Sequence, residues 1–419
     1  MIKGANADES VAVVGAGIIG LSIAWHLTKR GFQVVLYDPE MPGSGCSSGN
    51  AGAISPGSVT PLAMPGLLAK VPGMLLNPRS ALHIPLSYWI SAFPWIVRFA
   101  AAARPQRVAA IADALAGLYG DAISQHMQLL SEVGAADIVR KSGQLHLYRN
   151  ERQLRGSRGD WKLRAAHGAR FEKLDRAGIE ALEPQVGPAY RIGIFLPDAA
   201  MSVNPHRQAA AIAEALAANG VSFRRERAKS FVTEGARICG VTTHAGTHRH
   251  GHVVLAAGAW SAGLLRPLGY DVPLEAQRGY HLDFADSAIS LSRPIVPADR
   301  KVFITSMETG LRVAGTVEIA GLDAPGNEAR AKLLIDDLKA VLPSAQVEQP
   351  KPFWMGRRPC LPDSLPVIGR PRRWGGLICA FGHGHLGLTA SAATGSIVGR
   401  LVAGEEIRLD LDPFSIERF

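Results

Sequence analysis

Clustered histidines and a pair of adjacent arginines are the first side chains of this sequence to consider as metal ligands, bases or anion-binding groups. His383 and His385 stand in the glycine-rich stretch CAFGHGHLGLTASAATG, and His248, His250 and His252 alternate with other residues in HAGTHRHGH. Imidazole binds metals and accepts protons near neutral pH. Alternation, however, places the second set along one face of a strand, with no Cys, Asp or Glu to complete a metal site. We therefore predict no metal centre.

Two adjacent arginines are the strongest candidates for binding an anion. Arg357 and Arg358 occur in WMGRRP, and a guanidinium is a planar, two-pronged donor that matches a carboxylate. The sequence leaves open which of the two points into a site. Upstream, RGYHLDF alternates as a strand does, so Arg278 and Tyr280 share one face and His281 points to the other.

The elements that must position these side chains begin with VAVVGAGIIGLSIAWHLTKRGFQVVLYDPE. An apolar strand at 11–14 leads into Gly15-x-Gly17-x-x-Gly20, followed by a helical pattern over 18–30 and a second strand at 33–37 that ends at Asp38. The three glycines serve a tight turn, close approach of a pyrophosphate, and packing of helix on strand. The helix N-terminus favours phosphate, and an acid about 20 residues further on binds a ribose. This pattern predicts a dinucleotide site.

A further buried strand occurs more than 200 residues later, in HVVLAAGAWS. The segment before it, 221–250, has the pattern of short strands with turns near Gly235 and Gly246. Strands of the nucleotide domain are thus interrupted and resumed, which disfavours a two-domain NAD dehydrogenase with one contiguous nucleotide domain.

Composition and charge exclude several classes of protein. The chain of 419 residues is long enough for two domains, and its formal charge of +9 comes from scattered Lys and Arg. We therefore predict no nucleic-acid partner. Cys46, Cys239, Cys360 and Cys379 are far apart and form no CxxC motif, so neither disulfides nor zinc is expected.

Two segments bear on localisation. The N-terminus lacks a signal-type pattern, and together with the cysteines this predicts a cytoplasmic protein. The uncharged run from Ser80 to Val97 is interrupted by Pro85 and Pro94, so we expect it to be buried or interfacial instead of membrane-spanning. The longer stretch 61–107 is apolar with basic flanks. Core packing is the simpler interpretation of that stretch, and peripheral contact with the inner face of the plasma membrane is the alternative.

The motifs taken together resemble a known family. The GxGxxG-to-Asp38 unit is followed in order by GCSSGNAGAISPG, VVLAAGAWS, RGYHLDF, WMGRRPCLPDSLPVIG and FGHGHLGLT. Over nearly the whole chain this order is similar to the FAD-dependent D-amino-acid oxidase superfamily, most of all to its bacterial D-amino-acid dehydrogenase branch. HGHLGLT is also similar to members that act on D-proline or 4-hydroxy-D-proline.

The resemblance implies an α/β fold with a three-layer, Rossmann-like FAD-binding domain and an α+β substrate domain containing an antiparallel sheet. It assigns 1–60, 200–262 and 355–419 to the FAD-binding domain, and 61–199 and 263–354 to the substrate domain. Apolar alternation at 278–284 and 311–317 and helical patterns at 107–133 and 326–341 agree with this division.

The resemblance also implies site residues. The FAD-binding positions are Gly15, Gly17, Ile18, Ile19, Gly20, Asp38, Ser47, Ser48, Asn50, Ala51, Gly52, Ala257, Gly258, Trp260, Arg358, Gly382, His383, Gly384, His385, Leu386, Gly387, Leu388 and Thr389. The substrate-binding positions are Tyr280, Arg357, Arg358 and His385, and the hydroxyl of Tyr280 is expected to hydrogen-bond a substrate carboxylate. Of these residues, Arg358, Tyr280 and His385 are expected to act in catalysis. Which of His383 and His385 faces the substrate stays open, with His385 preferred.

The implied reaction is oxidation of a D-amino acid or cyclic D-imino acid, with hydride passing from Cα to flavin N5 and the imine hydrolysing to a 2-oxo acid. Hydride transfer needs positioning more than an acid–base dyad. A helix expected from Leu388 to Leu401 would direct its N-terminus at the reduced flavin. The FAD is expected to be non-covalent, and the electrons to pass to a quinone or respiratory carrier.

Three alternatives stay open at this point. Within the same chemistry, the enzyme is specific for D-proline or cis-4-hydroxy-D-proline, or acts as a sarcosine- or glycine-oxidase-like amine oxidase. In a different class, it is an RNA-modifying or non-catalytic flavoprotein, although scattered arginines argue against RNA. The third, an NAD dehydrogenase, is disfavoured by the interrupted nucleotide strands.

Overall fold

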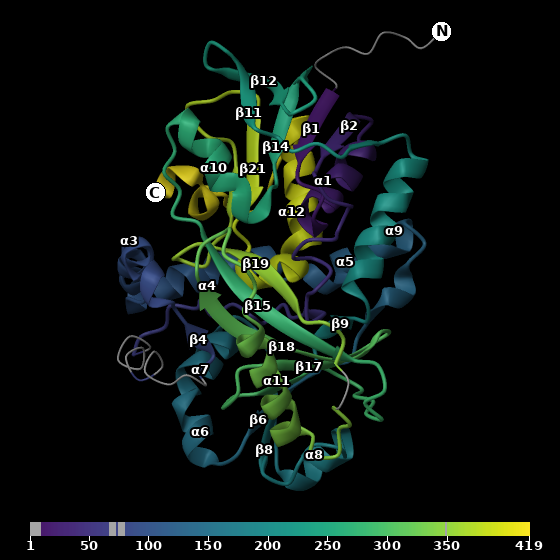
Figure 1. Cartoon of the computed structure of the whole chain (residues 1–419), viewed down its shortest axis with the longest axis vertical. Coiled ribbons are helices and arrows are strands. Elements are labelled where there is room, and N and C mark those ends of the chain that lie inside the picture. The colour runs from purple at the N-terminus through teal and green to yellow at the C-terminus, as the bar shows by residue number, and fades with distance from the viewer. Residues whose placement is uncertain (1–9, 67–72, 74–79, 348–349) are drawn as a thin grey trace.

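The computed structural model describes residues 10–66, 73, 80–347 and 350–419. Two sheets organise the chain, one in each half of the molecule, and the ribbon in Figure 1 shows the chain crossing between the halves several times. The prediction of an α/β fold with a parallel nucleotide-binding sheet and a second, largely antiparallel sheet is confirmed.

The upper half is built on a six-stranded sheet with the order β10-β2-β1-β14-β21-β20. Its strands are β1 (Ser10–Val14), β2 (Gln33–Tyr37), β10 (Ser222–Arg224), β14 (His252–Leu255), β20 (Val367–Gly369) and β21 (Leu377–Phe381). All neighbours pair in parallel except β20 and β21. Apart from Ser10 and His252 at their starts, the central strands β1, β14 and β21 are apolar, because both faces of the sheet are covered.

Two further layers cover this sheet. Helices α1 (Ile18–Thr28), α9 (Pro205–Ala218) and α12 (Gly387–Ala403) form one of them. A small antiparallel sheet of β11 (Ser230–Glu234), β12 (Arg237–Thr242) and β13 (Thr247–Arg249) packs on the other face. Gly395 and Gly399 let α12 approach α1, since a Cβ on Gly395 would lie 2.8 Å from the backbone of Ser22. The predicted three-layer arrangement is confirmed.

The lower half is built on a nine-stranded sheet with the order β19-β15-β18-β17-β16-β6-β8-β7, in which β4 also pairs with β18. Its strands are β4 (Leu82–His83), β6 (Gln144–Tyr148), β7 (Glu172–Leu174), β8 (Ile192–Leu196), β15 (Glu275–Phe284), β16 (Ile295–Pro297), β17 (Phe303–Met307), β18 (Gly310–Ile319) and β19 (Trp354–Cys360). Helix α11 (Glu328–Val341) packs on β15 and β18. The predicted strands at 278–284 and 311–317 and the predicted helix at 326–341 are therefore present.

The helical pattern at 107–133 forms two helices, α4 (Pro105–Tyr119) and α5 (Ala122–Glu132), separated at Gly120-Asp121. Their apolar faces share a core with α1 and α12 of the upper half, although the predicted division places 61–199 in the substrate domain. The packing of these two helices therefore differs from that division. The remaining short elements are β3 (Ala53–Ile54), β5 (Val139–Arg140), α6 (Glu151–Gly156), α7 (Arg158–Ala166), α8 (Arg176–Leu182), β9 (Ala200–Ser202) and α10 (Ser261–Leu265).

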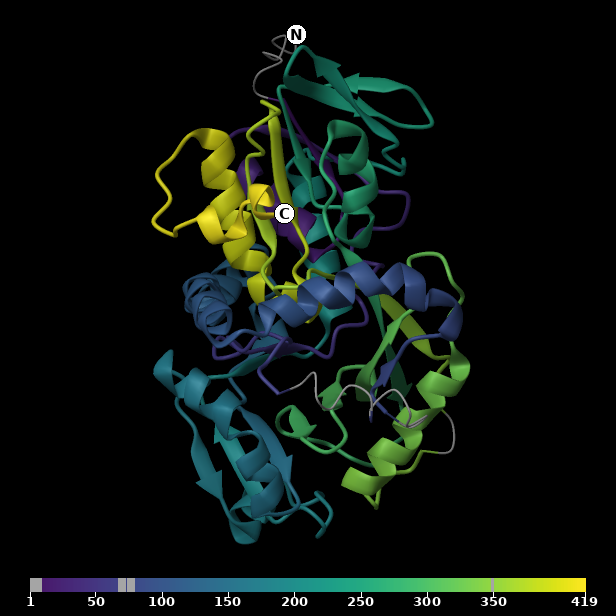
Figure 2. The ribbon, with the colours of Figure 1, turned by 90° about the vertical axis from the view of Figure 1, so that its left-hand side faces the viewer.

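The uncharged run at 80–97 does not form one span. It contains β4, the 3₁₀ turn η3 (Leu86–Tyr88) and the start of α3 (Trp89–Ala102). Figure 2 shows α3 lying across the molecule at the level where the two halves meet. By length and composition, one helical stretch among the described residues is apolar enough to cross a membrane, at 384–403, and 61% of it is buried within the protein. It is mostly α12, a core helix of the nucleotide-binding half.

Candidate active site

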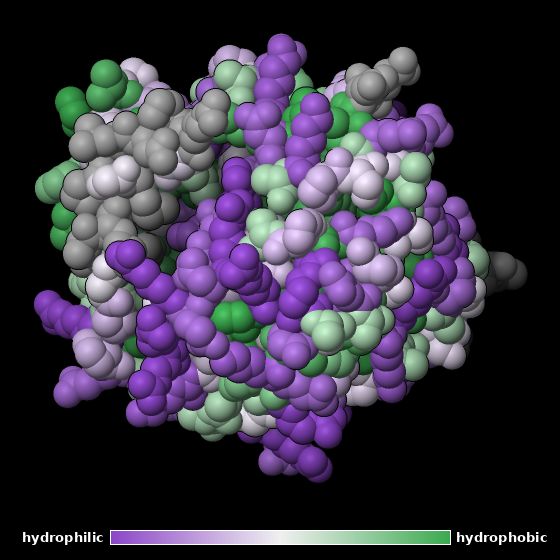
Figure 3. All heavy atoms as spheres, turned by 90° about the horizontal axis from the view of Figure 1, so that it is seen from below, coloured by the Kyte–Doolittle hydropathy of each residue, from purple (hydrophilic) through white to green (hydrophobic). Residues whose placement is uncertain are grey.

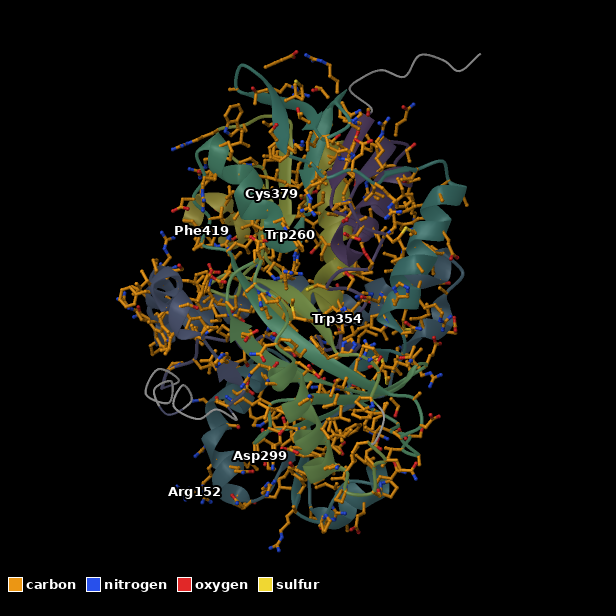
Figure 4. The ribbon with its side chains drawn as sticks, in the orientation of Figure 1. Arg152, Trp260, Asp299, Trp354, Cys379 and Phe419 are labelled. Atoms are coloured by element: carbon orange, nitrogen blue, oxygen red, sulfur yellow. The ribbon has the colours of Figure 1, made fainter. Side chains whose placement is uncertain are left out.

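A single large cavity of about 1420 Å³ lies between the two halves, and its wall contains most of the predicted motifs. Figure 4 marks Trp260 and Trp354, which lie in this central region and both belong to the wall. The upper sheet contributes the ends of its strands, and the lower sheet contributes one face of β15, β18 and β19. The fold therefore brings together segments that are more than 300 residues apart.

The end of the cavity below β1 has the features of a dinucleotide cradle. Gly15 has a φ of +109°, and a Cβ there would lie 2.3 Å from the carbonyl oxygen of Ala256. A Cβ on Gly20 would lie 1.9 Å from the carbonyl oxygen of Gly15, so this glycine serves packing and lies outside the cavity wall. Gly17, Ile18 and Ile19 line the cavity at the N-terminus of α1, whose first turn has no acidic residue. These donors and the open space fit a pyrophosphate.

Asp38 lines the same end of the cavity. One carboxylate oxygen accepts a hydrogen bond from the backbone N–H of Ala16 at 2.8 Å and the other from that of Glu40 at 2.9 Å. Burial raises the pKa of the carboxyl, and these two donors limit the rise. Two oxygens held at the end of β2 match an adenosine ribose, as predicted for an acid at this spacing.

The loop after Gly45 places only some of its predicted residues in the cavity. Ser47, Asn50 and Ala51 line it, and the Ser47 hydroxyl accepts a hydrogen bond from the N–H of Ile18 at 2.9 Å. Ser48 lies outside the wall, with its hydroxyl bonded to local carbonyl groups. Gly52 also lies outside; its φ is +78°, and a Cβ would lie 2.4 Å from the carbonyl oxygen of Ser202. Ser48 and Gly52 are therefore not part of the cavity wall, and their contact with FAD stays a prediction.

The segment after β14 contributes Ala257, Gly258 and Trp260 to the wall. Trp260 is 43% exposed, and the guanidinium of Arg357 lies over its ring, 5.8 Å from the centroid. The Nε of Arg357 also donates to the carbonyl of Leu322 at 2.6 Å. Arg357 is thus held against a tryptophan and a backbone carbonyl.

The glycine-rich segment before α12 lines the cavity from Gly382 through Leu388, including Gly384, Leu386 and Gly387. His383 is turned away from the open space, with Nε2 3.0 Å from the hydroxyl of Thr394, and burial lowers its pKa to about 3. His385 exposes its side chain to the cavity, and burial within the molecule, followed by the charge of Arg358, lowers its pKa to about 4. Thr389 lies outside the wall and is 1% exposed, and its contact with FAD stays a prediction.

Arg358 lies on the face of the lower sheet that meets the nucleotide end. A Cβ on Gly279 of β15 would lie 2.0 Å from Nη2 of Arg358, so the guanidinium rests directly on this glycine. Its Nη1 donates to the carbonyl oxygen of Thr316 at 2.9 Å. No carboxylate pairs with this arginine in the part of the chain that the structure describes, and burial lowers its pKa. Each of the two arginines thus donates one hydrogen bond to a backbone carbonyl and keeps further donors for a ligand. They differ in their surroundings, because the guanidinium of Arg357 lies over Trp260 and that of Arg358 rests on Gly279.

Tyr280 occupies the opposite face of the sheet. Its hydroxyl donates to the carboxylate of Glu318 and accepts from the N–H of Asn327, and the residue is 1% exposed. Arg278 lies on the same side, as predicted, with Nη1 3.8 Å from the Glu318 carboxylate. Although Tyr280 belongs to the wall at its edge, its hydroxyl is already bonded. The predicted contact of this hydroxyl with a substrate carboxylate is therefore wrong.

Comparison with known proteins agrees with this geometry. Residues 10–401 match the sequence model of a family described as FAD dependent oxidoreductase. The chain belongs to this FAD dependent oxidoreductase family. It is 36% identical over 415 residues to a D-amino-acid oxidase of Bradyrhizobium diazoefficiens, with 98% of each chain covered. It is 33% identical over 429 aligned positions to a D-amino acid dehydrogenase of Paramagnetospirillum magneticum, again with 98% of each covered.

Solved structures show the same fold. An L-proline dehydrogenase from P. horikoshii superposes with a TM-score of 0.76 at 16% identity, covering 98% of this chain and 97% of that one. A glycine oxidase from Geobacillus kaustophilus gives a TM-score of 0.75 at 22% identity, with 98% of both chains covered. Family membership establishes FAD as the cofactor of this oxidoreductase, and the glycine cradle, Asp38 and the N-terminus of α1 are the residues that would hold it.

Several residues of the oxidoreductase's cavity were missed by the sequence prediction. Trp354 lies over Gly356 and Gly49, since Cβ atoms on these glycines would lie 2.1 and 2.3 Å from its ring. Gln277, Lys301 and Thr316 also line the cavity. The sequence does contain a signal for Trp354, because Gly356, two positions further on, has no side chain and leaves the space that the indole of Trp354 occupies. Lys301 and Thr316 had no comparable signal, since loop and bulge conformations place them.

The histidines of HAGTHRHGH do not share one strand face in the oxidoreductase. His248 lies in β13 and pairs with Glu226 at 3.0 Å. His250 follows that strand, and its ring nitrogens lie 2.7 Å from Ser10 Oγ and 2.9 Å from the Tyr37 hydroxyl. The predicted alignment was wrong because the chain turns between β13 and β14. Among the described residues, no group of three or more His, Cys, Asp or Glu could hold a metal ion.

Proposed function

We propose that this FAD-dependent oxidoreductase is a D-amino-acid dehydrogenase. It oxidises the Cα–N bond of a D-amino acid to an imine, which water hydrolyses to the 2-oxo acid. The observation that carries the proposal is the unpaired guanidinium of Arg358 in the cavity wall. A half-buried cation without an anionic partner is costly unless a ligand neutralises it, and the carboxylate of an amino acid has the right charge and shape.

The residues around Arg358 fix where that carboxylate binds. The carbonyl of Thr316 restrains one end of the guanidinium, and Gly279 leaves the space in which it lies. Trp354 supplies an apolar wall on the same face of the sheet. A carboxylate held here has its Cα directed into the cavity, and positioning of this kind is the main contribution that hydride transfer needs from the protein.

His385 supports the same orientation. Because its pKa is about 4, its imidazole is neutral at neutral pH and puts no second positive charge beside Arg358. A neutral ring nitrogen can accept a hydrogen bond from the substrate amine. The amine itself must be neutral to react, since an ammonium has no lone pair to assist loss of hydride. His385 would therefore hold the amine without raising the charge of the pocket.

The N-terminus of α12 prepares the cavity for negative charge. Its first turn contains no acidic residue, and Gly387 and Leu388 of that turn line the cavity. FAD, when bound, accepts the hydride and carries the resulting charge. Backbone N–H groups and the helix dipole stabilise an anion at this end.

The proposal includes non-covalent binding of FAD. Cys46 is the cysteine in the cavity wall, as far as the structure describes it, and burial raises the pKa of its thiol to about 11. The thiol is therefore protonated and a poor nucleophile. Acid precipitation followed by a spectrum of the supernatant tests this directly, because flavin retained in the pellet would contradict it.

The substrate class is tested by reduction of an artificial dye. D-alanine, D-proline and cis-4-hydroxy-D-proline are offered to the purified holoenzyme, with their L-isomers and N-methylglycine beside them. We expect turnover of D-isomers only. Preference for the two cyclic substrates would establish the narrower proline-type enzyme, and turnover of only L-isomers or N-methylglycine would contradict the proposal.

The electron acceptor distinguishes the two candidate functions, a dehydrogenase and an oxidase. We propose a quinone or respiratory carrier, which goes with a cytoplasmic protein at the inner face of the plasma membrane. The 36% identity to a D-amino-acid oxidase favours oxygen as the alternative. Hydrogen peroxide formed at the same rate as D-alanine is consumed in air would establish the oxidase. Turnover that needs a dye or quinone would establish the dehydrogenase.

A further inference from the structure

A row of large apolar side chains is exposed on the outer face of η3 and α3. Leu86 and Ile90 are each 90% exposed, Phe93 is 61% and Val97 is 50% exposed. Spacings of four, three and four residues align them along one side of a helix. Hydrophobic atoms gather at the left-hand edge of Figure 3, the side on which α3 lies in Figure 1. Single exposed apolar residues are ordinary, but a contiguous row marks an interaction surface.

The opposite face of α3 is also apolar and is already covered. Ala92 and Trp95 pack against Ile84, Ile319 and Cys360. Trp95 and Phe99 stack with ring centroids 5.0 Å apart, and both line the cavity. The core therefore accounts for one face of the helix only. A helix that is apolar all round needs a second apolar environment for its other face.

The charges beside the row indicate what that environment is. Arg98, Arg104 and Arg107 follow it and are exposed, and no Asp or Glu occurs between Ser80 and Ile111. None of the three arginines has an ion pair within the described ranges. In a symmetric dimer formed through this face, like charges would meet across the axis. Anionic lipid headgroups would instead neutralise them.

We propose that the outer face of α3 docks on an anionic lipid surface. Leu86, Ile90, Phe93 and Val97 enter the boundary between headgroups and acyl chains, and the arginines contact lipid phosphates. Within the described part of the chain, helix α3, about 10 Å across, then lies between the lipid and the cavity. Docking itself is independent of the proposed function. Its consequence, that an acceptor dissolved in the bilayer approaches the cavity beside α3, rests on that function.

Sedimentation of the holoenzyme with vesicles tests the surface. Vesicles of phosphatidylcholine alone are compared with vesicles containing phosphatidylglycerol, at low and high salt. We expect binding to the anionic vesicles that falls at least fivefold in the double variant Ile90→Ser/Phe93→Ser and in Arg98→Gln/Arg104→Gln. The matched controls, Met127→Ser for an exposed apolar side chain on α5 and Arg152→Gln for an exposed cation on α6, should bind as the wild type does.

Dye-linked turnover of D-alanine should be equal in all these variants, which shows that they are folded. Equal sedimentation of the wild type and Ile90→Ser/Phe93→Ser would overturn the proposal. The proposal would also be overturned if the wild type does not bind vesicles and instead forms a dimer, seen in sedimentation velocity, that Ile90→Ser/Phe93→Ser abolishes. If the wild type binds vesicles but does not turn over D-alanine, the proposed function is contradicted and docking stays supported.

A second inference comes from the backbone of Thr316. Its φ is +60°, a conformation that a β-branched residue rarely adopts. It lies at a bulge, because β15 pairs Arg278 with Glu318 but Tyr280 with Gly315. Strained residues of this kind persist where the surrounding structure holds them, and they gather at functional sites.

The bulge directs two groups of Thr316 toward the site. Its carbonyl oxygen accepts the hydrogen bond from Nη1 of Arg358 at 2.9 Å. Thr316 is 6% exposed and lies in the cavity wall. Its hydroxyl has no hydrogen-bond partner within the part of the chain that is described. An unmade hydrogen bond on a buried hydroxyl is costly, and a ligand beside Arg358 would supply the missing partner.

We infer that Thr316 is a specificity-determining residue whose hydroxyl donates to the carboxylate that Arg358 binds. Thr316 thus takes the role that the sequence predicts for Tyr280. This inference rests on the proposed function, because it needs a carboxylate at Arg358. Benzoate serves as the probe, since its binding changes the flavin spectrum without requiring turnover.

Thr316→Val removes the hydroxyl and keeps the branched side chain, whereas Thr316→Ser keeps the hydroxyl. We expect Thr316→Val to raise the dissociation constant of benzoate and the KM for D-alanine at least fivefold, with kcat within twofold. Thr316→Ser should restore both constants to within twofold of the wild type. Ala288→Gly, at another position with positive φ (+54°) outside the cavity wall, is the control for backbone strain and should change only Tm.

An unchanged dissociation constant in Thr316→Val would overturn the inference, even if its Tm falls. Unchanged benzoate binding in Arg358→Lys would instead contradict the proposed function, because the carboxylate would then bind elsewhere.

Discussion

Arg278 and Arg358 lie on neighbouring strands but on opposite faces of the lower sheet, and their surroundings differ in kind. Arg278 is 1% exposed and donates to the carbonyls of Gly321, Ala324 and Pro325, with Glu318 close by. Arg358 has one carbonyl partner, Thr316, and otherwise faces the cavity. One cation is satisfied by the protein, and the other keeps donors for a ligand.

The partners of the two arginines indicate that Arg278 stabilises the fold and that Arg358 is available to bind a ligand. A guanidinium in a low-dielectric interior is tolerated when its donors and its charge are matched. Where the protein does not pair all the donors and the charge of a guanidinium, the free-energy cost is offset only when an anionic ligand binds. Residue type and sequence motif do not distinguish the roles of Arg278 and Arg358, whereas their hydrogen-bond and ion-pair partners do. Four substitutions test this contrast between the two arginines.

Replacing Arg278 should have the largest effect, and the effect should be on stability. Arg278→Leu leaves the carboxylate of Glu318 buried without its cation, so we expect the free energy of unfolding to fall by about 3–5 kcal/mol. Urea unfolding of the holoenzyme measures this. Arg152→Leu, at an exposed site, should change it by no more than about 0.5 kcal/mol. An Arg278→Leu protein as stable as the wild type would remove the contrast.

Replacing Arg358 should act on the reaction instead. Arg358→Ala removes a charge-assisted pair with the substrate carboxylate, so we expect kcat/KM to fall about 100-fold, on the scale of 3 kcal/mol. Stability should be unchanged or higher, since an unmatched, half-buried cation is removed. Steady-state kinetics and urea unfolding of the same preparation separate the two effects. A change below threefold in both Arg357→Ala and Arg358→Ala would exclude this motif from substrate binding.

Displacing Arg358 without removing it should give a smaller loss. Gly279→Ala puts a methyl group where the guanidinium lies, at 2.0 Å from Nη2, so the side chain must shift. We expect kcat/KM to fall about 10-fold, since small misplacements near the reacting atoms are costly. The effect should vanish in an Arg358→Ala background, because no guanidinium is left to displace. An equal effect in both backgrounds would show that Gly279 acts on something else.

The sequence predicted most of the fold because its signals are local. The apolar run of β1, the glycines after it and Asp38 define the nucleotide unit without reference to the rest of the chain. Strand alternation likewise placed Arg278 and Tyr280 on one side. The break at Gly120-Asp121 and the packing of α4 and α5 on α12 were not predictable, because long-range contacts decide them.

The site was predicted less well than the fold. Alternation says that two residues share a face, but it does not say which face meets the flavin. Tyr280 and Arg358 were therefore assigned to one pocket, although β15 and β19 pair so that Gly279 and Arg358 face the cavity and Tyr280 faces α11. Ser48 and Gly52 share a loop with true wall residues, and only the local turn decides which side chains point inward. Thr316 depends on a bulge that no local pattern announces.

The last substitution tests the corrected place of Tyr280. Tyr280→Phe removes the hydrogen bond to Glu318 and the one from the N–H of Asn327. Glu318 keeps the Asn327 side chain and Arg278 as partners. We therefore expect a loss of about 1 kcal/mol in stability and a kcat/KM within twofold of the wild type.

Burial and the bond to Glu318 raise the pKa of the Tyr280 hydroxyl to about 12. The folded state thus holds the proton more tightly than the unfolded state does, and the hydroxyl's contribution is complete below about pH 10 and lost as pH rises toward 12. Urea unfolding of both proteins from pH 7 to 11 should show the difference shrinking above pH 10, while their kcat/KM profiles coincide from pH 7 to 10. A tenfold fall in kcat/KM would return Tyr280 to the substrate site and make the two faces of the sheet functionally alike.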